Sequence, residues 1–243
     1  MLKVLSFGQT DTGLRRSNNE DSFLCHPDLA VWAVADGMGG AASGEVASKI
    51  FVDTALEVFS GAEKTTEKEN FLVVQEIFRI ANERIFLSAK NRRQYQGMGC
   101  TAELLAFSGQ DYLVGHVGDS RTYLFRDGEL KQLTRDHSLV QDQLDRGLIT
   151  AEEAKNHALR NVILRAVGVE EALAVDFIRG GSFPGDFFLL CSDGLFTMVA
   201  DSTIRGVLSL PLTLSQKTEK LIQLAKSAGG HDNITVILCE VKE

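Results

Sequence analysis

The sequence predicts an α+β fold in which antiparallel sheets are covered by helices. Two neighbouring segments show the apolar periodicity of amphipathic helices, and several runs typical of hairpin-linked strands follow them. One more strand-like run closes the chain, so strands far apart in sequence must meet to complete the sheets. An alternating parallel fold would instead place a helix between most pairs of strands.

The first elements lie in the N-terminal third of the chain. The apolar run Leu29–Ala35 predicts a buried strand that ends in a glycine-rich turn starting at Asp36. Helical periodicity over Ser43–Phe59, and again over Asn70–Lys90, predicts two helices. The polar segment Gly61–Asn70 between them is expected to be a surface loop.

The remaining elements are mostly strands. Apolar and β-branched residues mark five strand-like runs, which are Thr101–Phe107, Tyr112–Val117, Arg121–Phe125, Leu130–Leu133 and Phe187–Cys191. A hairpin signal at Arg126–Glu129 links two of them. Leu214–Ala228 is expected to form a helix ended by Gly229 and Gly230, and Asn233–Val241 to form the last strand.

Composition describes an ordinary globular protein. Of the 243 residues, 44% are hydrophobic and 24% charged, and no linker or internal repeat is visible, so we expect one domain over residues 1–243. A net charge of −8 disfavours nucleic-acid binding. No run approaches the length of a membrane span, no signal peptide is recognisable, and the four cysteines are widely spaced. A cytoplasmic protein with reduced, buried thiols and no membrane contact is therefore expected.

Four aspartates occupy unusual positions at the ends of apolar strands, with a glycine beside them or two residues away, namely Asp36, Asp119, Asp193 and Asp232. Such a position holds a side chain rigidly, and the neighbouring glycine lets a ligand or another backbone approach closely. Each aspartate alone is explained as well by a turn cap. If the four meet, their mutual repulsion requires a cation, and an oxygen-only ligand set suits Mg²⁺ or Mn²⁺ better than zinc.

The segment Arg16–Ser22 carries further polar groups ahead of an apolar run. The planar guanidinium of Arg16 matches the oxygens of a phosphate, so near a metal site it would act as a phosphate clamp. Taken alone, it is an ordinary surface arginine.

Seven short motifs, in this order, closely resemble the PPM family of type 2C protein phosphatases, especially its bacterial single-domain members. The motifs are Arg16-x-x-x-Glu20-Asp21, Val34-Ala35-Asp36-Gly37-Met38-Gly39-Gly40, Gly97-Met98-Gly99-Cys100-Thr101, Gly118-Asp119-Ser120-Arg121, Leu133-Thr134-x-Asp136-His137-Ser138, Ser192-Asp193-Gly194-Leu195 and Asp232-Asn233-Ile234-Thr235. The resemblance runs from Gly8 to Val241. It implies a four-layer α/β/β/α sandwich, with two antiparallel central sheets flanked by helices, and a mobile flap over about residues 136–168.

The resemblance also implies roles for individual residues. It makes Asp36 the bridge between two Mn²⁺ or Mg²⁺ ions, completed by Asp193 and Asp232 on the first ion and by the carbonyl of Gly37 on the second. Glu20 would act on the metal directly or through a water.

Three more roles follow from the same resemblance. Asp119, with Asp193, would form a weaker third metal site, and Arg16 would hold the phosphate. Asp21 would support Arg16 or the ligands rather than bind metal.

The implied reaction is hydrolysis of phosphoserine or phosphothreonine on proteins. Two cations roughly 3.5–4 Å apart acidify a bridging water, so no covalent phosphoenzyme is needed. Arg16, Asp36 and Asp193 are the catalytic residues on this view. Some family members carry histidine where this chain has Met38, and since methionine cannot donate a proton, a water on the metal is expected to protonate the leaving group.

The implied partners are a phosphorylated protein and a cognate bacterial Ser/Thr kinase, with the enzyme acting as a monomer. Two alternatives remain open. One is a pseudophosphatase that binds phosphoproteins without cleaving them, and the other is a metal-dependent phosphoesterase acting on small molecules or nucleic acid.

Overall fold

The structure of the protein is a computed structural model that describes residues 3–39, 43–62 and 66–243. In this part of the chain the strands form two sheets. The five-stranded sheet has the order β1-β11-β10-β7-β8, with β1 Lys3–Asp11, β11 Ile234–Lys242, β10 Phe187–Cys191, β7 Arg121–Arg126 and β8 Glu129–Gln132. The six-stranded sheet has the order β2-β3-β5-β6-β9 with β4 beside β3; the bounds are β2 Asp21–His26, β3 Val31–Met38, β4 Gly99–Cys100, β5 Ala102–Ser108, β6 Asp111–Val117 and β9 Asp176–Gly181.

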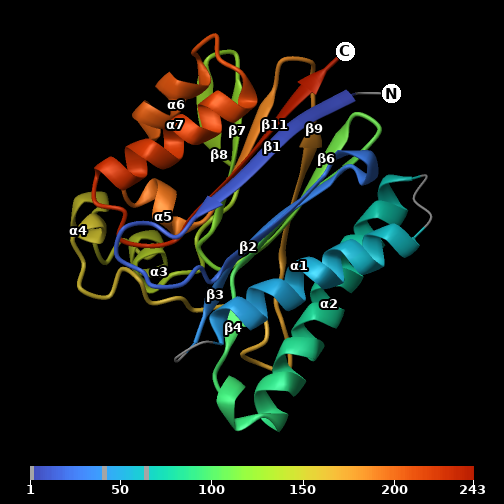
Figure 1. The fold of residues 1–243 in the computed structure, drawn as a ribbon, viewed down its shortest axis with the longest axis vertical. Helices are drawn as coiled ribbons and strands as arrows, with labels where there is room; N and C mark the ends of the chain where they lie inside the picture. The colour runs from blue at the N-terminus through green and yellow to red at the C-terminus, as the bar shows by residue number, and fades with distance from the viewer. Residues whose placement is uncertain (1–2, 40–42, 63–65) are drawn as a thin grey trace.

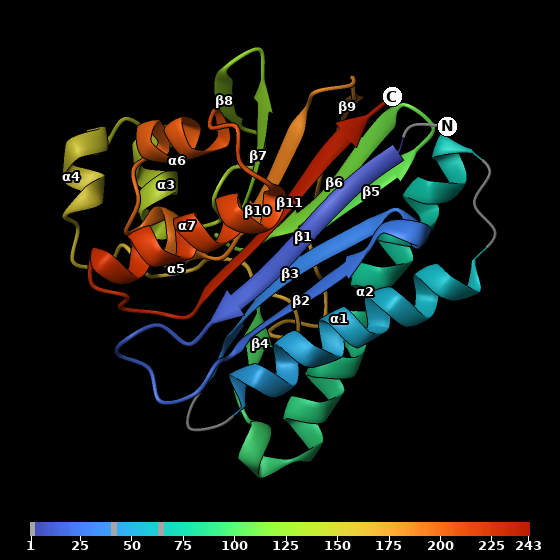
Figure 2. The ribbon, with the colours of Figure 1, turned by 45° about the horizontal axis from the view of Figure 1, so that its top comes forward.

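Helices cover the outer face of each sheet (Figures 1 and 2). The long helices α1 Gly44–Gly61 and α2 Glu67–Asn91 pack on the six-stranded sheet. On the five-stranded sheet lie α5 Asp193–Phe196, α6 Asp201–Leu208 and α7 Leu214–Ser227. The expected four-layer α/β/β/α sandwich with antiparallel central sheets is therefore confirmed.

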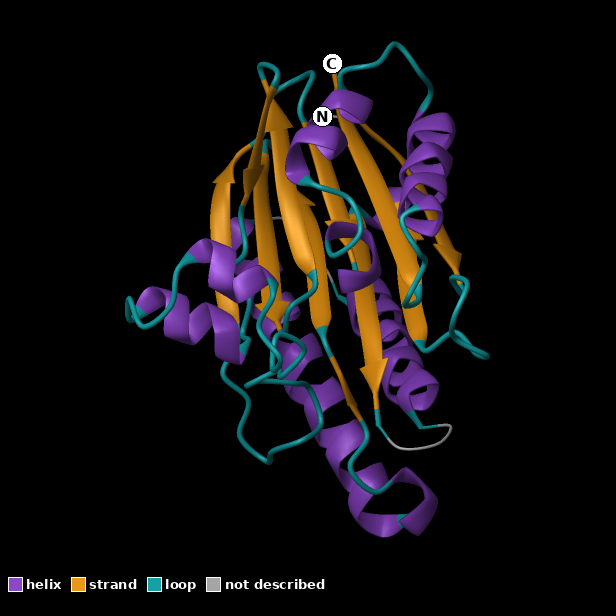
Figure 3. Cartoon of the chain, turned by 90° about the vertical axis from the view of Figure 1, so that its left-hand side faces the viewer, coloured by secondary structure: helices purple, strands orange, loops and turns teal. Residues whose placement is uncertain are grey.

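Three apolar clusters hold these layers together. The cluster between the two sheets contains Trp32 of β3, Phe188 of β10 and Ile237 of β11, all fully buried. The other two clusters bury the apolar faces of the helices against the outer faces of the sheets. Each helix layer thus depends on contact with a sheet, as expected for amphipathic helices. In Figure 3 the two sheets are seen with helices on their outer sides.

Most sequence-based boundaries agree with the structure to within a few residues. Between Arg121–Arg126 and Glu129–Gln132, the hairpin turn contains Asp127 and Gly128, with φ of 51° and 80°. This is the pair of positive values that a tight hairpin requires. The four cysteines are free thiols, and all but Cys25 are buried.

Two expectations need correction. The strand that was expected to end at Ala35 continues to Met38, because β4 pairs with Gly37 and Met38. The expected loop Gly61–Asn70 is shorter, since the side chain of Thr66 caps α2 and brings the helix forward to Glu67. Part of this loop, residues 63–65, and the expected turn residue Gly40 lie outside the described residues.

Four strands escaped the sequence analysis, namely β1, β2, β4 and β9. Strand β1 is an edge strand with alternating exposed and half-buried residues, and it pairs along its whole length with β11. Strands of this kind lack the continuous apolar run that marks a buried strand. In the described part of the chain, no helix combines the length and apolar character needed to cross a bilayer.

Candidate metal centre

Five aspartates gather at one end of the sandwich. Burial raises the pKa of Asp36 well above its ordinary value, and four neighbouring carboxylates raise it further, those of Asp21, Asp193, Asp119 and Asp232. Repulsion between like charges weakens with distance, so these contributions come from carboxylates close to Asp36. The four aspartates singled out in the sequence are therefore brought together by the fold, and Asp21 joins them.

Strand ends position these side chains. Asp36 lies near the end of β3 and is paired in register with Asp21, the first residue of β2. Asp193 is the first residue of α5 directly after β10, Asp119 follows β6, and Asp232 precedes β11. Residues from both sheets thus meet where the sandwich opens to solvent at one end.

The backbone of Asp36 is held from one side by Thr101. The Asp36 N–H donates to Thr101 Oγ1 at 3.0 Å, and the Thr101 N–H donates to the Asp36 carbonyl at 2.8 Å. The Thr101 hydroxyl also lies 2.7 Å from that of Ser120, the residue after Asp119. One side chain therefore connects the backbone of Asp36 to the segment that carries Asp119.

Gly37 and Gly44 allow a close approach of three segments. A Cβ atom on Gly37 would lie 2.1 Å from the Gly44 carbonyl oxygen and 2.6 Å from that of Glu20. A Cβ atom on Gly44 would lie 2.6 Å from Glu20 Oε2. The Glu20 carboxylate therefore sits at the N-terminus of α1, where the helix dipole favours negative charge.

Three buried carboxylate oxygens have no hydrogen-bond partner within the described residues, namely Asp21 Oδ1 and Asp193 Oδ1 in the acidic cluster and Glu45 Oε2 in the first turn of α1. The other oxygen of Asp21 accepts from Ser192 Oγ at 2.7 Å and from Thr235 Oγ1 at 2.6 Å. Burial of Asp21 nevertheless raises its pKa to about 6. Unpaired, buried oxygens among mutually repelling carboxylates fit a hard divalent cation such as Mn²⁺ or Mg²⁺.

The carboxylates are near one another without forming a closed ligand set. Across residues 3–39, 43–62 and 66–243, no three acidic, histidine or cysteine side chains meet at metal-binding spacing. A bound divalent cation would compensate the like charges of these carboxylates.

Burial, together with the negative charge of Asp136, raises the pKa of Asp119 to about 6. Arg121 acts in the opposite direction. It forms a bidentate pair with Asp136, at 2.9 and 2.7 Å, and its guanidinium lies 3.7 Å from the ring centre of Phe196. The segment that begins the expected flap thus packs beside Asp119.

Arg16 is connected to the site through Asp232. Its Nη2 donates to Asp232 Oδ2 at 2.6 Å, and 51% of the Arg16 side chain remains exposed. Asp21 was expected to support either Arg16 or the ligands. Its hydrogen bonds are accepted from two hydroxyl groups, and none of them comes from Arg16. The two hydroxyls belong to Ser192 and Thr235, which lie in the segments that carry Asp193 and Asp232. Asp21 therefore supports the segments of these candidate ligands directly.

Asn233 was not singled out in the sequence, although it stands in one of the seven motifs. Its Oδ1 accepts from the Glu20 N–H at 2.7 Å, and its Nδ2 donates to the carbonyls of Thr12 and Asn18 at 3.0 and 2.9 Å. The side chain is buried and ties the N-terminal loop carrying Arg16 to the start of β11. A polar residue beside a candidate ligand is the only sequence signal for this role.

Asn233→Ala is expected to lower the free energy of unfolding by about 2–3 kcal/mol, because three backbone groups lose their partner. Thermal unfolding monitored by circular dichroism measures the change. Asn156→Ala is a matched control, since that asparagine is exposed and makes one long hydrogen bond at 3.5 Å. Equal melting temperatures for the two variants would contradict the proposed role of Asn233.

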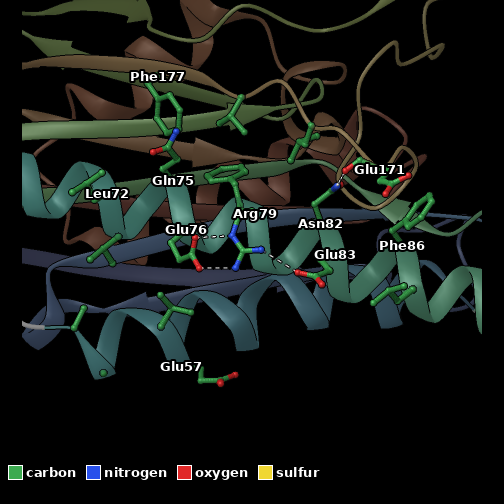
Figure 4. Close-up of a pocket in the computed structure, with 18 of the residues that line it drawn as sticks. Glu57, Leu72, Gln75, Glu76, Arg79, Asn82, Glu83, Phe86, Glu171 and Phe177 are labelled. Atoms are coloured by element: carbon green, nitrogen blue, oxygen red, sulfur yellow. Dashed lines mark hydrogen bonds and ion pairs between the residues drawn. The ribbon is translucent and has the colours of Figure 1, made fainter.

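A groove of about 1430 Å³ lies away from the carboxylates, along α1, α2 and residues 171–177. Its lining mixes apolar side chains with the ion-paired residues Arg79, Glu76 and Glu83 (Figure 4). None of the clustered aspartates lines it. The candidate centre is therefore identified by its chemistry rather than by the volume of a cavity.

The two-sheet sandwich carries an acidic, oxygen-rich site at one end, of the kind that can hold divalent cations. A family model described as Protein phosphatase 2C matches residues 14–238. The chain belongs to the protein phosphatase 2C family.

Individual relatives agree with this assignment. The chain is 40% identical over 236 residues to the serine/threonine protein phosphatase PstP of Mycobacterium tuberculosis, covering 96% of this chain but 44% of PstP. It is 39% identical over 244 residues to the serine/threonine phosphatase stp of Listeria monocytogenes, covering 96% and 94% of the two chains. A crystal structure of the PstP catalytic domain in complex with two manganese ions superposes with a TM-score of 0.91, 35% identity and full coverage of both chains.

Proposed function

We propose that the protein hydrolyses phosphoserine and phosphothreonine on proteins, using two Mn²⁺ or Mg²⁺ ions and no covalent phosphoenzyme. The observation that carries this proposal is the gathering of aspartates from both sheets at one end of the sandwich, where burial and the neighbouring carboxylates raise the pKa values of Asp36 and Asp193. A relative of the same fold is described with two manganese ions, which supports the same metal stoichiometry here.

The residues proposed to hold the ions are those expected from the sequence. Asp36 would bridge both, with Asp193 and Asp232 on the first and the carbonyl of Gly37 on the second. Glu20, beside the N-terminus of α1, would act on the second ion directly or through a water. When bound, the ions would acidify a water and neutralise charge on the phosphoryl group.

Asp119 is proposed to contribute, with Asp193, to a weaker third site. Its charge raises the pKa of both Asp36 and Asp193, which supports this placement.

The chain's own residues would supply binding and positioning. The Arg16 side chain is half exposed, and its guanidinium would bind the phosphate oxygens in addition to, or in place of, Asp232. Met38, at the end of β3, has no transferable proton, so a side chain at this position cannot protonate the leaving alkoxide.

The proposal is tested by dephosphorylation of a phosphothreonine peptide, with Mn²⁺ titrated against a chelator, for the wild type and Asp193→Asn. We expect activity that requires Mn²⁺ and is lost in the variant while its circular dichroism spectrum is retained. A folded wild type that is inactive at saturating Mn²⁺ would favour a phosphoprotein-binding role. A clear preference for nucleotides over phosphopeptides would contradict the protein substrate.

Arg16→Ala is expected to lower kcat/KM for a phosphothreonine peptide by about 10- to 100-fold, since charge-assisted hydrogen bonds to the phosphate are lost. Steady-state kinetics at saturating Mn²⁺ measures this change. Arg15→Ala removes a neighbouring exposed arginine and is expected to retain wild-type kinetics. Similar losses in both variants would indicate a general charge effect and argue against a specific clamp.

We further propose that residues 1–243 act as a single catalytic domain, in the cytoplasm and as a monomer, with residues 136–168 as a flap beside the site. Relatives are named as bacterial serine/threonine phosphatases, which supports a phosphoprotein substrate and a cognate Ser/Thr kinase as its opposing enzyme.

A further inference from the structure

His137 makes an unusual double contact with the residue that precedes Asp119. The His137 N–H donates to the Gly118 carbonyl at 2.7 Å, and the Gly118 N–H donates to His137 Nδ1 at 3.1 Å. Both polar groups of Gly118 are thus engaged by one residue, whose side chain is 9% exposed. The contact lies at the point where β6 ends and the acidic site begins.

Gly118 has a backbone conformation that needs such support. Its φ is +107°, and a Cβ atom there would lie 2.6 Å from Thr101 Cβ, so only glycine fits. Glycine is also the residue with the most conformational freedom. The direction of the next side chain, Asp119, therefore depends on contacts that fix the Gly118 peptide.

The protonation of the His137 ring follows from its partners. Since Nδ1 accepts the Gly118 N–H, the ring proton is on Nε2, which donates to Asp176 Oδ2 at 3.1 Å. Arg165 Nη1 donates to the other oxygen of Asp176 at 3.0 Å and also lies 3.2 Å from His137 Nε2, so the guanidinium and the ring share Asp176 as their acceptor. Burial lowers the pKa of His137, in agreement with a neutral ring that can accept a hydrogen bond.

These contacts also connect the two ends of the expected flap. The His137 carbonyl accepts from the Leu164 N–H at 2.7 Å, and Ser138 forms a β-bridge with Ile163. Arg165, next along the chain, belongs to the same cluster through Asp176. His137 therefore contacts both ends of the expected flap and the Gly118–Asp119 segment.

We propose that His137 is a positioning residue that fixes the Gly118–Asp119 peptide and links the direction of the Asp119 carboxylate to the anchored flap. This inference rests on the proposed function, because it assumes that Asp119 contributes to a metal site. The Nδ1 contact is the part that orients Asp119, and the Nε2 contact is the part that orients the ring.

Two substitutions separate these contacts. His137→Asn places an oxygen near the position of Nδ1, so it can still accept the Gly118 N–H while losing Asp176. His137→Gln reaches the position of Nε2 and loses Gly118. His157→Gln is a matched control, since its Nδ1 accepts the Leu159 N–H at 3.2 Å without contacting the acidic site.

The test measures Mn²⁺ binding by electron paramagnetic resonance and hydrogen exchange of the Gly118 amide in the metal-free protein. In His137→Gln we expect about tenfold weaker binding of the most weakly held Mn²⁺, together with faster exchange at Gly118. His137→Asn should resemble the wild type in both, and His157→Gln should change neither. Melting temperatures establish that each variant is folded.

Equal behaviour of His137→Asn and His137→Gln would overturn the inference, as would unchanged Gly118 exchange in His137→Gln. The exchange measurement needs neither metal nor substrate, so it stands even if the phosphatase proposal fails. Conversely, an active wild-type enzyme with an unaffected Gly118 amide in His137→Gln would refute the role of His137 alone.

Discussion

Asp36→Asn is expected to abolish Mn²⁺-dependent phosphatase activity and to raise the melting temperature of the metal-free protein. The loss should exceed about 100-fold, because even residues that only support metal ligands cost 10- to 100-fold when replaced. The gain in stability follows from the raised pKa of Asp36, since a neutral amide is not repelled by the neighbouring carboxylates. Opposite effects on activity and stability distinguish a functional carboxylate from a structural one.

Phosphopeptide turnover and thermal unfolding in a chelator measure the two effects. Asp111→Asn provides the control, because that aspartate is exposed at the start of β6, at the far end of the strand from Asp119. It should change neither quantity appreciably. An Asp36→Asn variant that remains active, or that unfolds at a lower temperature than the wild type without metal, would contradict the proposed centre.

Metal-free protein is expected to become less stable as the pH rises from about 4 to 7, and Mn²⁺ is expected to remove this loss. The pKa values of Asp21 and Asp119 are raised from 3.8 to about 6 in the folded state. The folded state therefore holds their protons more tightly than the unfolded state, so each favours folding at low pH and disfavours it once ionised. A displacement of this size corresponds to about 3 kcal/mol for each group.

Bound Mn²⁺ would compensate the ionised carboxylates, and a ligand at 100 times its dissociation constant adds about 2.7 kcal/mol. Thermal unfolding between pH 4 and 8, with Mn²⁺ or a chelator, measures both effects. Comparison with Asp21→Asn isolates one carboxylate, because contributions from histidines cancel in the difference. A wild type and an Asp21→Asn variant with identical pH dependence would contradict the assigned cause.

The local sequence pattern predicts the longest helices, most of the buried strands and the candidate metal ligands. Helical periodicity defined α1, α2 and α7, and apolar runs defined the strands that are buried on both faces, such as β10. The aspartates at the strand ends indicated a candidate metal site, because a carboxylate beside an apolar run is unfavourable without a compensating partner. The order of the seven motifs then indicated the family.

Tertiary structure decided what depends on contacts between distant segments. The edge strand β1 becomes a strand through its pairing with β11, the partner of Arg16 is Asp232 more than 200 positions away, and Asn233 reaches back to the N-terminal loop. The double contact of His137 with Gly118 likewise needs the turn after β8. Short-range periodicity records which face of an element is buried, whereas long-range pairing depends on how the layers pack, and a single sequence carries no direct signal for it.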